Sequence, residues 1–306
     1  MALGYDKPLY ILAFDHRGSF QKKFFGVTGE PNAEETARIA DAKKVIYEGL
    51  LRALDEGVPR EAAGGLVDEQ FGAEVARDAR SRGLTLAMPV EKSGQDEFDF
   101  QYGADYGAHI LEFDPSFSKV LVRWNPEGDA EMNARQGARL KELGDWLHAN
   151  GRIFLFELLV PAEPHQLEAV GGDAAKWDSE ERPKLMRGAI EQLHAAGVEP
   201  DIWKIEGIDQ REDCEILSAE CRKDGRDGVA CVVLGRGADD AAVDHWLRTG
   251  SGVPGYIGFA IGRSIWWDPL KAFVDGASAR EDSAKLIAAN YRRFIEVYDG
   301  GEGGAG

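Results

Sequence analysis

Two short segments, IFLFELLVP at residues 153–161 and DIWKIEG at residues 201–207, decide how this chain folds. Each is a largely apolar segment of strand length with a charged residue in its middle, Glu157 in the first and Lys204 in the second, and the second segment also carries Asp201 and Glu206 near its ends. A strand that is buried on both faces normally reads as a nearly continuous hydrophobic run, and a charge inside it is costly unless it is paired. Both segments therefore predict buried parallel strands whose charged side chains serve a purpose.

The same alternation of a short apolar run and an amphipathic segment repeats along the whole chain. Strands are expected at Leu9–Asp15, Gly65–Asp68, Leu84–Glu91, Lys119–Trp124, Ile153–Val160, Asp201–Glu206, Ala230–Leu234 and Tyr256–Ile261. This organisation predicts an α/β protein with a closed, single (β/α)8 barrel, and an open doubly wound sheet is the alternative. No linker divides the chain, so we expect one barrel domain over residues 1–299 and a disordered glycine-rich tail at 300–306.

Capping and stop signals place helices between these strands. Asn32 followed by Glu35 predicts a capped helix start, and apolar stripes that end before Gly151 and Gly197 predict two further helices. Weaker helices are expected at about 72–82, 211–223, 239–249 and 279–298. The polar segment Pro161–Arg182 is interpreted as a long loop over one face of the barrel.

Composition argues against several classes of function. The formal net charge of -18 argues against a general basic face for nucleic acid. No stretch approaches the ~18 apolar residues that span a bilayer, and nothing resembles a signal peptide. The three cysteines, Cys214, Cys221 and Cys231, lack CxxC spacing, which fits a reducing compartment better than disulfides or structural zinc. We therefore expect a cytoplasmic protein.

Charged residues close the predicted strands at the rim where barrel enzymes carry their active sites. Those expected at the rim are Asp15, Asp68, Glu91, Lys119, Arg123, Glu157 and Lys204. A partly desolvated lysine beside a second cation loses its proton more easily, and its neutral amine can attack a carbonyl to form a Schiff base. Glu157 is then placed to move protons between the carbinolamine and the leaving hydroxyl. The alternative is a buried Glu157–Lys204 ion pair without a catalytic role.

Seven segments, taken in order, resemble the class I tagatose-bisphosphate aldolase family. They are AFDHRGSF (13–20), LVDEQFG (66–72), MPVEKSG (88–94), SKVLVRWN (118–125), FELLVP (156–161), WKIEG (203–207) and GFAIGRSIW (258–266). The likeness runs from about residue 9 to 270. It is closer still to the aldolase-like domain at the C-terminus of some bacterial inositol-catabolism kinases.

The resemblance implies a (β/α)8 barrel without metal or cofactor, in which Lys204 is the Schiff-base lysine, Glu157 the catalytic glutamate and Lys119 the strand-four lysine. Asp15 and Arg17 match the strand-one Asp-x-Arg motif. The phosphate end of the family site falls on Gly235, Arg236, Gly237, Gly262 and Arg263. Glycine amides and an arginine suit a phosphate, although a tight turn before a helix is the alternative for the GRG triplet.

The implied activity is that of a lyase in inositol catabolism. Its substrate is a phosphorylated keto-sugar, 2-deoxy-5-keto-gluconate 6-phosphate, cleaved to dihydroxyacetone phosphate and malonate semialdehyde. Arg123, Trp124 and Asn125 depart from the tagatose aldolases and favour a different substrate from theirs. Asp15, Glu91 and Arg123 are expected to position hydroxyls or a carboxylate.

The sequence also leaves alternative functions open. A metal-dependent class II aldolase would need clustered histidines, and only His16 and His165 are expected near the rim. A catalytically weak barrel could serve as a sugar-phosphate sensor or as the partner of a separate sugar kinase. The chain could also associate with copies of itself as a homo-oligomer. No kinase anion-hole or Walker A motif occurs, so the chain is not expected to phosphorylate a substrate.

Overall fold

The structure, a computed structural model, describes residues 3–300 and contains a closed barrel of eight parallel strands. The strands are β1 (Leu9–Ala13), β2 (Ala63–Leu66), β3 (Thr85–Pro89), β4 (Phe117–Arg123), β5 (Ile153–Leu159), β6 (Ile202–Glu206), β7 (Ala230–Leu234) and β8 (Tyr256–Ile261). They pair in chain order, and β8 closes the barrel by pairing with β1. The predicted single (β/α)8 barrel is confirmed, and the open sheet is wrong.

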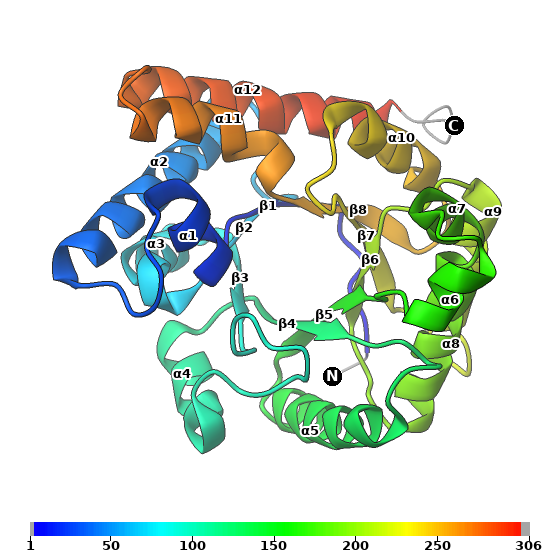
Figure 1. The fold of residues 1–306 in the computed structure, drawn as a ribbon. Coiled ribbons are helices and arrows are strands. Elements are labelled where there is room, and N and C mark those ends of the chain that lie inside the picture. The colour runs from blue at the N-terminus through cyan, green and yellow to red at the C-terminus, as the bar shows by residue number, and fades with distance from the viewer. Residues whose placement is uncertain (1–2, 301–306) are drawn as a thin grey trace.

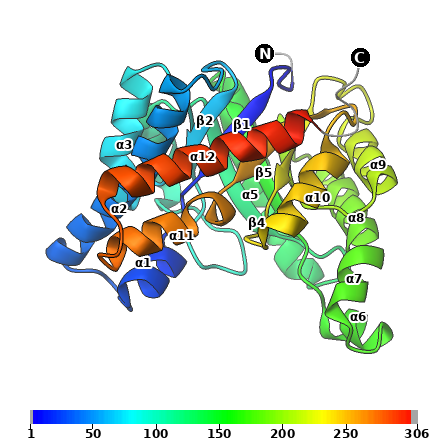
Figure 2. The same ribbon diagram turned by 90° about the horizontal axis from the view of Figure 1, so that it is seen from above.

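Helices surround the strands as an outer ring (Figure 1). They are α1 (Gly18–Phe25), α2 (Ala33–Asp55), α3 (Glu69–Ser81), α4 (Tyr106–Phe113), α5 (Ala130–Ala149), α6 (Pro164–Ala169), α7 (Ala174–Glu180), α8 (Arg182–Ala195), α9 (Arg211–Cys221), α10 (Asp240–Gly250), α11 (Arg263–Val274) and α12 (Arg280–Asp299), with a short 3-10 turn at Gly103–Asp105. Figure 2 shows α1 and α6 at the same end of the barrel. They follow β1 and β5 in the chain, so this is the end where the strands finish.

The predicted capping box is present at the start of α2. The Asn32 side chain accepts a hydrogen bond from the Glu35 amide at 3.0 Å, and the Glu35 carboxylate accepts one from the Asn32 amide at 2.9 Å. Two otherwise unpaired amides are satisfied in this way, which fixes where the helix begins. The helices expected before Gly151 and Gly197 are α5 and α8.

The segment Pro161–Arg182 is more ordered than its polar composition predicts. It contains the short helices α6 and α7, and the Asp173 side chain caps α7 by accepting from the amides of Ala175 and Lys176 at 3.0 Å each. The interpretation of this segment as a loop is therefore wrong. Of the predicted tail 300–306, only Gly300, the C-cap of α12, lies within the described residues.

An apolar layer fills the amino-terminal end of the barrel. Its buried members are Leu9, Ile11, Ala13, Leu66, Ala87, Phe117, Leu155, Ile202, Ala230, Val232 and Ala260. Tyr5, which precedes β1, packs edge-on against Phe117 with ring centroids 5.2 Å apart. Because side chains pack this end, the opening that the described residues form lies at the carboxyl ends of the strands. Within residues 3–300, none of the helices has the length and apolar character needed to span a bilayer.

Candidate functional site

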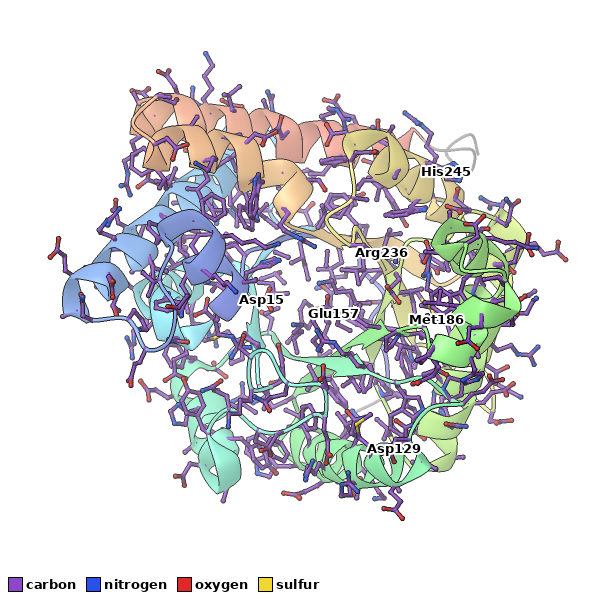
Figure 3. All side chains as sticks on the ribbon, viewed as in Figure 1. Asp15, Asp129, Glu157, Met186, Arg236 and His245 are labelled. Atoms are coloured by element: carbon purple, nitrogen blue, oxygen red, sulfur yellow. The ribbon has the colours of Figure 1, made fainter. Side chains whose placement is uncertain are left out.

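A cavity of about 930 Å³ lies at the carboxyl ends of the strands. Its volume falls within the range typical of ligand pockets, roughly 300–1,000 Å³. Figure 3 shows Asp15 and Glu157 toward the middle of the barrel and Arg236 nearer its wall, whereas Asp129 and His245 lie among the outer helices. The cavity is therefore lined by the strand ends on which the sequence concentrates charge.

The inward positions on β4, β5 and β6 bring three of the predicted residues together. Glu157 on β5 is directly opposite Lys204 on β6 in the register of the sheet, and Lys119 enters from β4. All three are buried and line the cavity. Side chains alternate along a strand, so residues of one parity on neighbouring strands face the same interior.

The ammonium of Lys119 lies where three buried carboxylates converge. Its Nζ is 2.9 Å from Asp15 Oδ2, 2.9 Å from Glu91 Oε1 and 3.0 Å from Glu157 Oε2. Burial by itself lowers the pKa of this lysine, but Asp15, Glu157 and Glu91 together outweigh it and raise the pKa above its ordinary value. Lys119 therefore stays protonated and acts as a fixed positive charge.

Lys204 has a different environment, although it is nearly as buried. Its Nζ lies 3.0 Å from Glu157 Oε1, and no other carboxylate of residues 3–300 is within ion-pair distance. Glu157 is thus shared between two lysines, one on each oxygen. Lys204 is therefore held by one shared carboxylate, whereas Lys119 is held by three.

Three carboxylates of this network differ in how readily they ionise. Burial alone raises the pKa of Asp15 and of Glu157, but Lys119 outweighs it with help from Lys204, so both have a lowered pKa. For Glu91, burial exceeds the opposing effect of Lys119 and Arg17, and its pKa is raised. Asp15 and Glu157 are consequently ionised at neutral pH, and Glu91 is the carboxyl that protonates most easily.

Arg17 is buried beside this network. Its guanidinium donates to Glu91 at 3.2 Å and to the Gln101 side chain at 3.2 Å, while its Nε has no hydrogen-bond partner among the described residues. Gln101 was not identified from the sequence, because it follows β3 in an irregular segment without a strand pattern. The strand-one motif thus contributes both an anion and a cation to the cavity.

The opposite wall of the cavity is formed after β7 and β8. The GRG triplet is a tight turn, in which Arg236 and Gly237 have positive φ (53° and 71°) and the Ala238 amide bonds to the Gly235 carbonyl at 3.1 Å. Arg236 is bound by Asp178 at 2.5 Å and by Glu206 at 3.2 Å. Since these two carboxylates neutralise Arg236, the prediction that it holds a phosphate is not favoured by its contacts.

Arg263, the first residue of α11, is the available cation on this wall. Its Nη2 donates to the Arg236 carbonyl at 2.6 Å, and no carboxylate of the described residues lies within ion-pair distance of it. Its guanidinium packs on Gly237, where an added Cβ would come within 2.1 Å of Arg263 Cζ. Gly262 precedes it as the N-cap of α11, and the amides that begin a helix favour an anion.

Arg123 provides a second unneutralised guanidinium at the end of β4. Its Nη1 donates to the Gln95 carbonyl at 2.8 Å, and no carboxylate within residues 3–300 pairs with it. In a closed barrel of eight strands paired in order, β4 and β8 lie on opposite sides and β6 lies between them. Arg123 and Arg263 therefore flank Lys204 across the cavity mouth.

Asp68 is the one predicted site residue that lies away from the cavity. It is fully buried, forms an ion pair with Lys43, and caps α3 by accepting from the Phe71 amide at 2.9 Å. The Lys43 Nζ also donates to the carbonyls of Phe14 at 2.7 Å and His16 at 3.0 Å. The prediction that Asp68 joins the other charged residues at the rim as part of the substrate site is therefore wrong, because α3 and Lys43 use its carboxylate.

Sequence reasoning also missed residues that complete the site. Glu206 is in phase with Lys204 on β6, and together with Asp178 it binds Arg236, a pairing that the strand pattern does not predict. His16 was placed near the rim without a function and lines the cavity. Within residues 3–300, no group of three or more His, Cys, Asp or Glu side chains is arranged as a metal site.

A family model described as "Uncharacterized protein conserved in bacteria (DUF2090)" matches residues 4–301. The chain belongs to the DUF2090 family. No curated protein matches it. The crystal structure of Cgl0159 from Corynebacterium glutamicum is similar to this DUF2090 chain with a TM-score of 0.55 and 16% identity, covering 95% of this chain and 88% of that one. An identity so low shows a shared barrel fold and nothing about activity. The resemblance to class I aldolases stays a prediction.

Proposed function

We propose that this DUF2090 chain is a class I aldolase, a lyase that cleaves a phosphorylated keto-sugar through a Schiff base on Lys204. One observation carries the proposal. Lys204, 3% exposed, faces a large open cavity with a single carboxylate 3.0 Å from its Nζ, and that carboxylate is shared with a second lysine. A buried ion pair that served stability alone would not require an open cavity above it.

The proposed chemistry uses only side chains of the site. Glu157 takes the Lys204 proton, and the neutral amine attacks the ketone carbon to give a carbinolamine. Loss of water, with the proton supplied through Glu157, gives an iminium. The hydroxyl two carbons away then loses its proton, the carbon–carbon bond breaks, and its electron pair moves into the iminium to form an enamine. Protonation of the enamine carbon and hydrolysis release the second product and restore Lys204.

The two unneutralised arginines support a substrate with an anionic group at each end. Arg263 and the start of α11 suit a phosphate, and Arg123 on the opposite side suits a carboxylate. Lys204 on β6 lies between them in the strand order, where the ketone of a linear substrate would reach it. 2-Deoxy-5-keto-gluconate 6-phosphate has this arrangement of groups, with the phosphate next to the ketone and the carboxylate at the far end.

Borohydride trapping tests the proposal. Separate samples of the protein are incubated with borohydride and one ligand each, either dihydroxyacetone phosphate or a member of a panel of keto-sugar phosphates. The adduct is then located by peptide mass. We expect a reduced adduct on the peptide that contains Lys204, and none in Lys204→Met. Lys92→Met is the matched control, since Lys92 is an exposed lysine lining the same cavity.

Two further results would contradict the proposal. A folded wild-type protein that forms no adduct with any ligand, yet binds sugar phosphates, would indicate a sensor. Turnover that is lost with EDTA and restored by zinc would indicate a metal-dependent aldolase.

We keep the cytoplasm as the proposed location, because the three cysteines are free and buried.

A further inference from the structure

His16 is the ionisable side chain of the cavity that the proposed chemistry leaves without a role. It lies between Asp15 and Arg17 on the loop after β1 and lines the cavity. Its ring is held edge-on by Trp266 with centroids 5.4 Å apart. The backbone carbonyl of His16 is fixed by Lys43 at 3.0 Å.

The space for this ring is provided by a glycine. A Cβ on Gly262 would lie 3.3 Å from His16 Cε1 and 2.2 Å from the Ala13 carbonyl oxygen, so a side chain there would push against both. The imidazole is therefore packed between α11 and the end of β1 in one orientation. The ring is thus positioned by packing against Trp266 and Gly262, without a hydrogen bond.

Neither ring nitrogen of His16 has a hydrogen-bond partner in the described part of the chain, and Nδ1 is buried without one. Buried polar atoms are nearly always hydrogen-bonded, so an unsatisfied one needs an explanation. The neighbouring carboxylates Asp15, Glu91 and Glu157 are all engaged by cations. The imidazole is consequently the base in this part of the cavity that carries no cation.

We propose that His16 is a catalytic residue that accepts the proton of the substrate hydroxyl when the carbon–carbon bond breaks. The inference rests on the proposed aldolase function. It assigns the proton of the substrate hydroxyl to His16, because Glu157 is held between two lysines and is poorly placed to accept it. The imidazole removes the hydroxyl proton, the oxygen forms the new carbonyl, and the bond electrons enter the Lys204 iminium. The imidazolium then gives its proton to the enamine carbon, so atoms and electrons balance without a further reactant.

The electrostatic surroundings connect this step to the substrate phosphate. Burial is the main cause that lowers the pKa of His16 to about 4, and the positive charges of Arg263, Lys43 and Lys204 contribute to the lowering against the opposing effect of Asp15. The ring is therefore neutral and able to accept a proton at neutral pH. A phosphate held at Arg263 would offset that positive charge and raise the pKa of the imidazole. His16 then becomes a stronger base when a phosphorylated substrate is bound.

His16→Gln separates proton transfer from Schiff-base formation. We expect kcat for cleavage to fall about 100- to 10,000-fold while borohydride trapping on Lys204 is retained. His245→Gln is the matched control, because His245 lies on the outside of α10 (Figure 3) and should leave both readouts unchanged. Wild-type cleavage rates in His16→Gln, with trapping intact, would overturn the role of His16 and leave the aldolase proposal standing.

The pH profile gives an independent readout on the wild-type protein. The acid limb of kcat, which reports the substrate complex, is expected at higher pH than the acid limb of kcat/KM, which reports the free protein. The acid limb of kcat should be absent in His16→Gln. In parallel, the imidazole pKa of the wild type followed by NMR is expected to rise when inorganic phosphate is added. An unchanged pKa with saturating phosphate would overturn the link between Arg263 and His16.

Discussion

The two ends of the barrel interior share the same strands and the same side-chain parity, yet their chemistry is opposite. Ile202 on β6 belongs to the apolar layer, and Lys204, two residues further along, belongs to the charged cavity. Leu155 and Glu157 on β5 show the same change, as do Phe117 and Lys119 on β4. One step of two residues, roughly 6.6 Å along a strand, therefore separates the packed end from the open end.

The comparison shows where stability and function reside in this fold. The apolar layer stabilises the barrel by removing side chains from water. The charged layer above it is a weak source of stability, because bringing ions out of water costs free energy that their mutual attraction only partly offsets. Charges retained one step above a dry core thus indicate a function for the open end.

Among substitutions in the two layers, Lys119→Met is expected to have the largest effect on stability. The substitution leaves three buried carboxylates without their shared cation, and losing one partner of a buried pair costs about 3–5 kcal/mol. The free energy of unfolding, measured by denaturant titration at pH 7, should fall by that amount. Lys92→Met, an exposed control, should change it by no more than about 0.5 kcal/mol.

The same variant has a defined pH dependence. Because Lys119 outweighs burial and lowers the pKa of Asp15, the pair stabilises the fold above the ordinary pKa of Asp15, and this is lost as the pH falls through the lowered value. The stability difference between wild type and Lys119→Met should therefore shrink on acidification. If the difference in the free energy of unfolding grew toward low pH, Lys119 would not stabilise the protein through its ion pairs with these carboxylates.

At the packed end, Ile202→Ala should destabilise the protein without changing its chemistry. Ile202 is fully buried, and removing a large aliphatic side chain from a core typically costs about 2–5 kcal/mol. Folded Ile202→Ala is expected to trap substrate on Lys204 as the wild type does. Loss of trapping in the folded variant would show that the apolar layer also controls the reactivity of Lys204, so that the two layers are not independent.

The smallest effect should distinguish the two arginines of the β7–β8 wall. Arg263→Ala is expected to raise KM for phosphorylated substrates about 10- to 100-fold, since it removes a charged hydrogen-bond donor worth about 1.5–3 kcal/mol. Arg236→Ala should mainly lower the melting temperature, because Asp178 and Glu206 lose their partner. Equal changes in KM for the two variants would show that both hold the phosphate.

Sequence patterning was informative wherever a side chain's position follows from its strand. The apolar runs predicted eight strands, and β7 and β8 have the predicted bounds. Glu157 and Lys204 were recognised because a charge in a buried run is unusual, and the register places them opposite each other. Asp68 was assigned wrongly because side-chain alternation predicts only the face of the strand on which a residue lies. It does not predict that the N-terminus of α3 and the buried Lys43 bind the Asp68 carboxylate.

The amino-acid sequence was therefore enough to predict the barrel and the concentration of charge at the carboxyl ends of its strands, because periodicity is a local property of the chain. Which of these charges neutralise one another follows only from the fold. Pairing depends on distances between residues far apart in the chain, such as Lys119 with Asp15 or Arg236 with Asp178. Within residues 3–300, those distances leave Arg123 and Arg263 without a carboxylate partner and the His16 ring without a hydrogen bond.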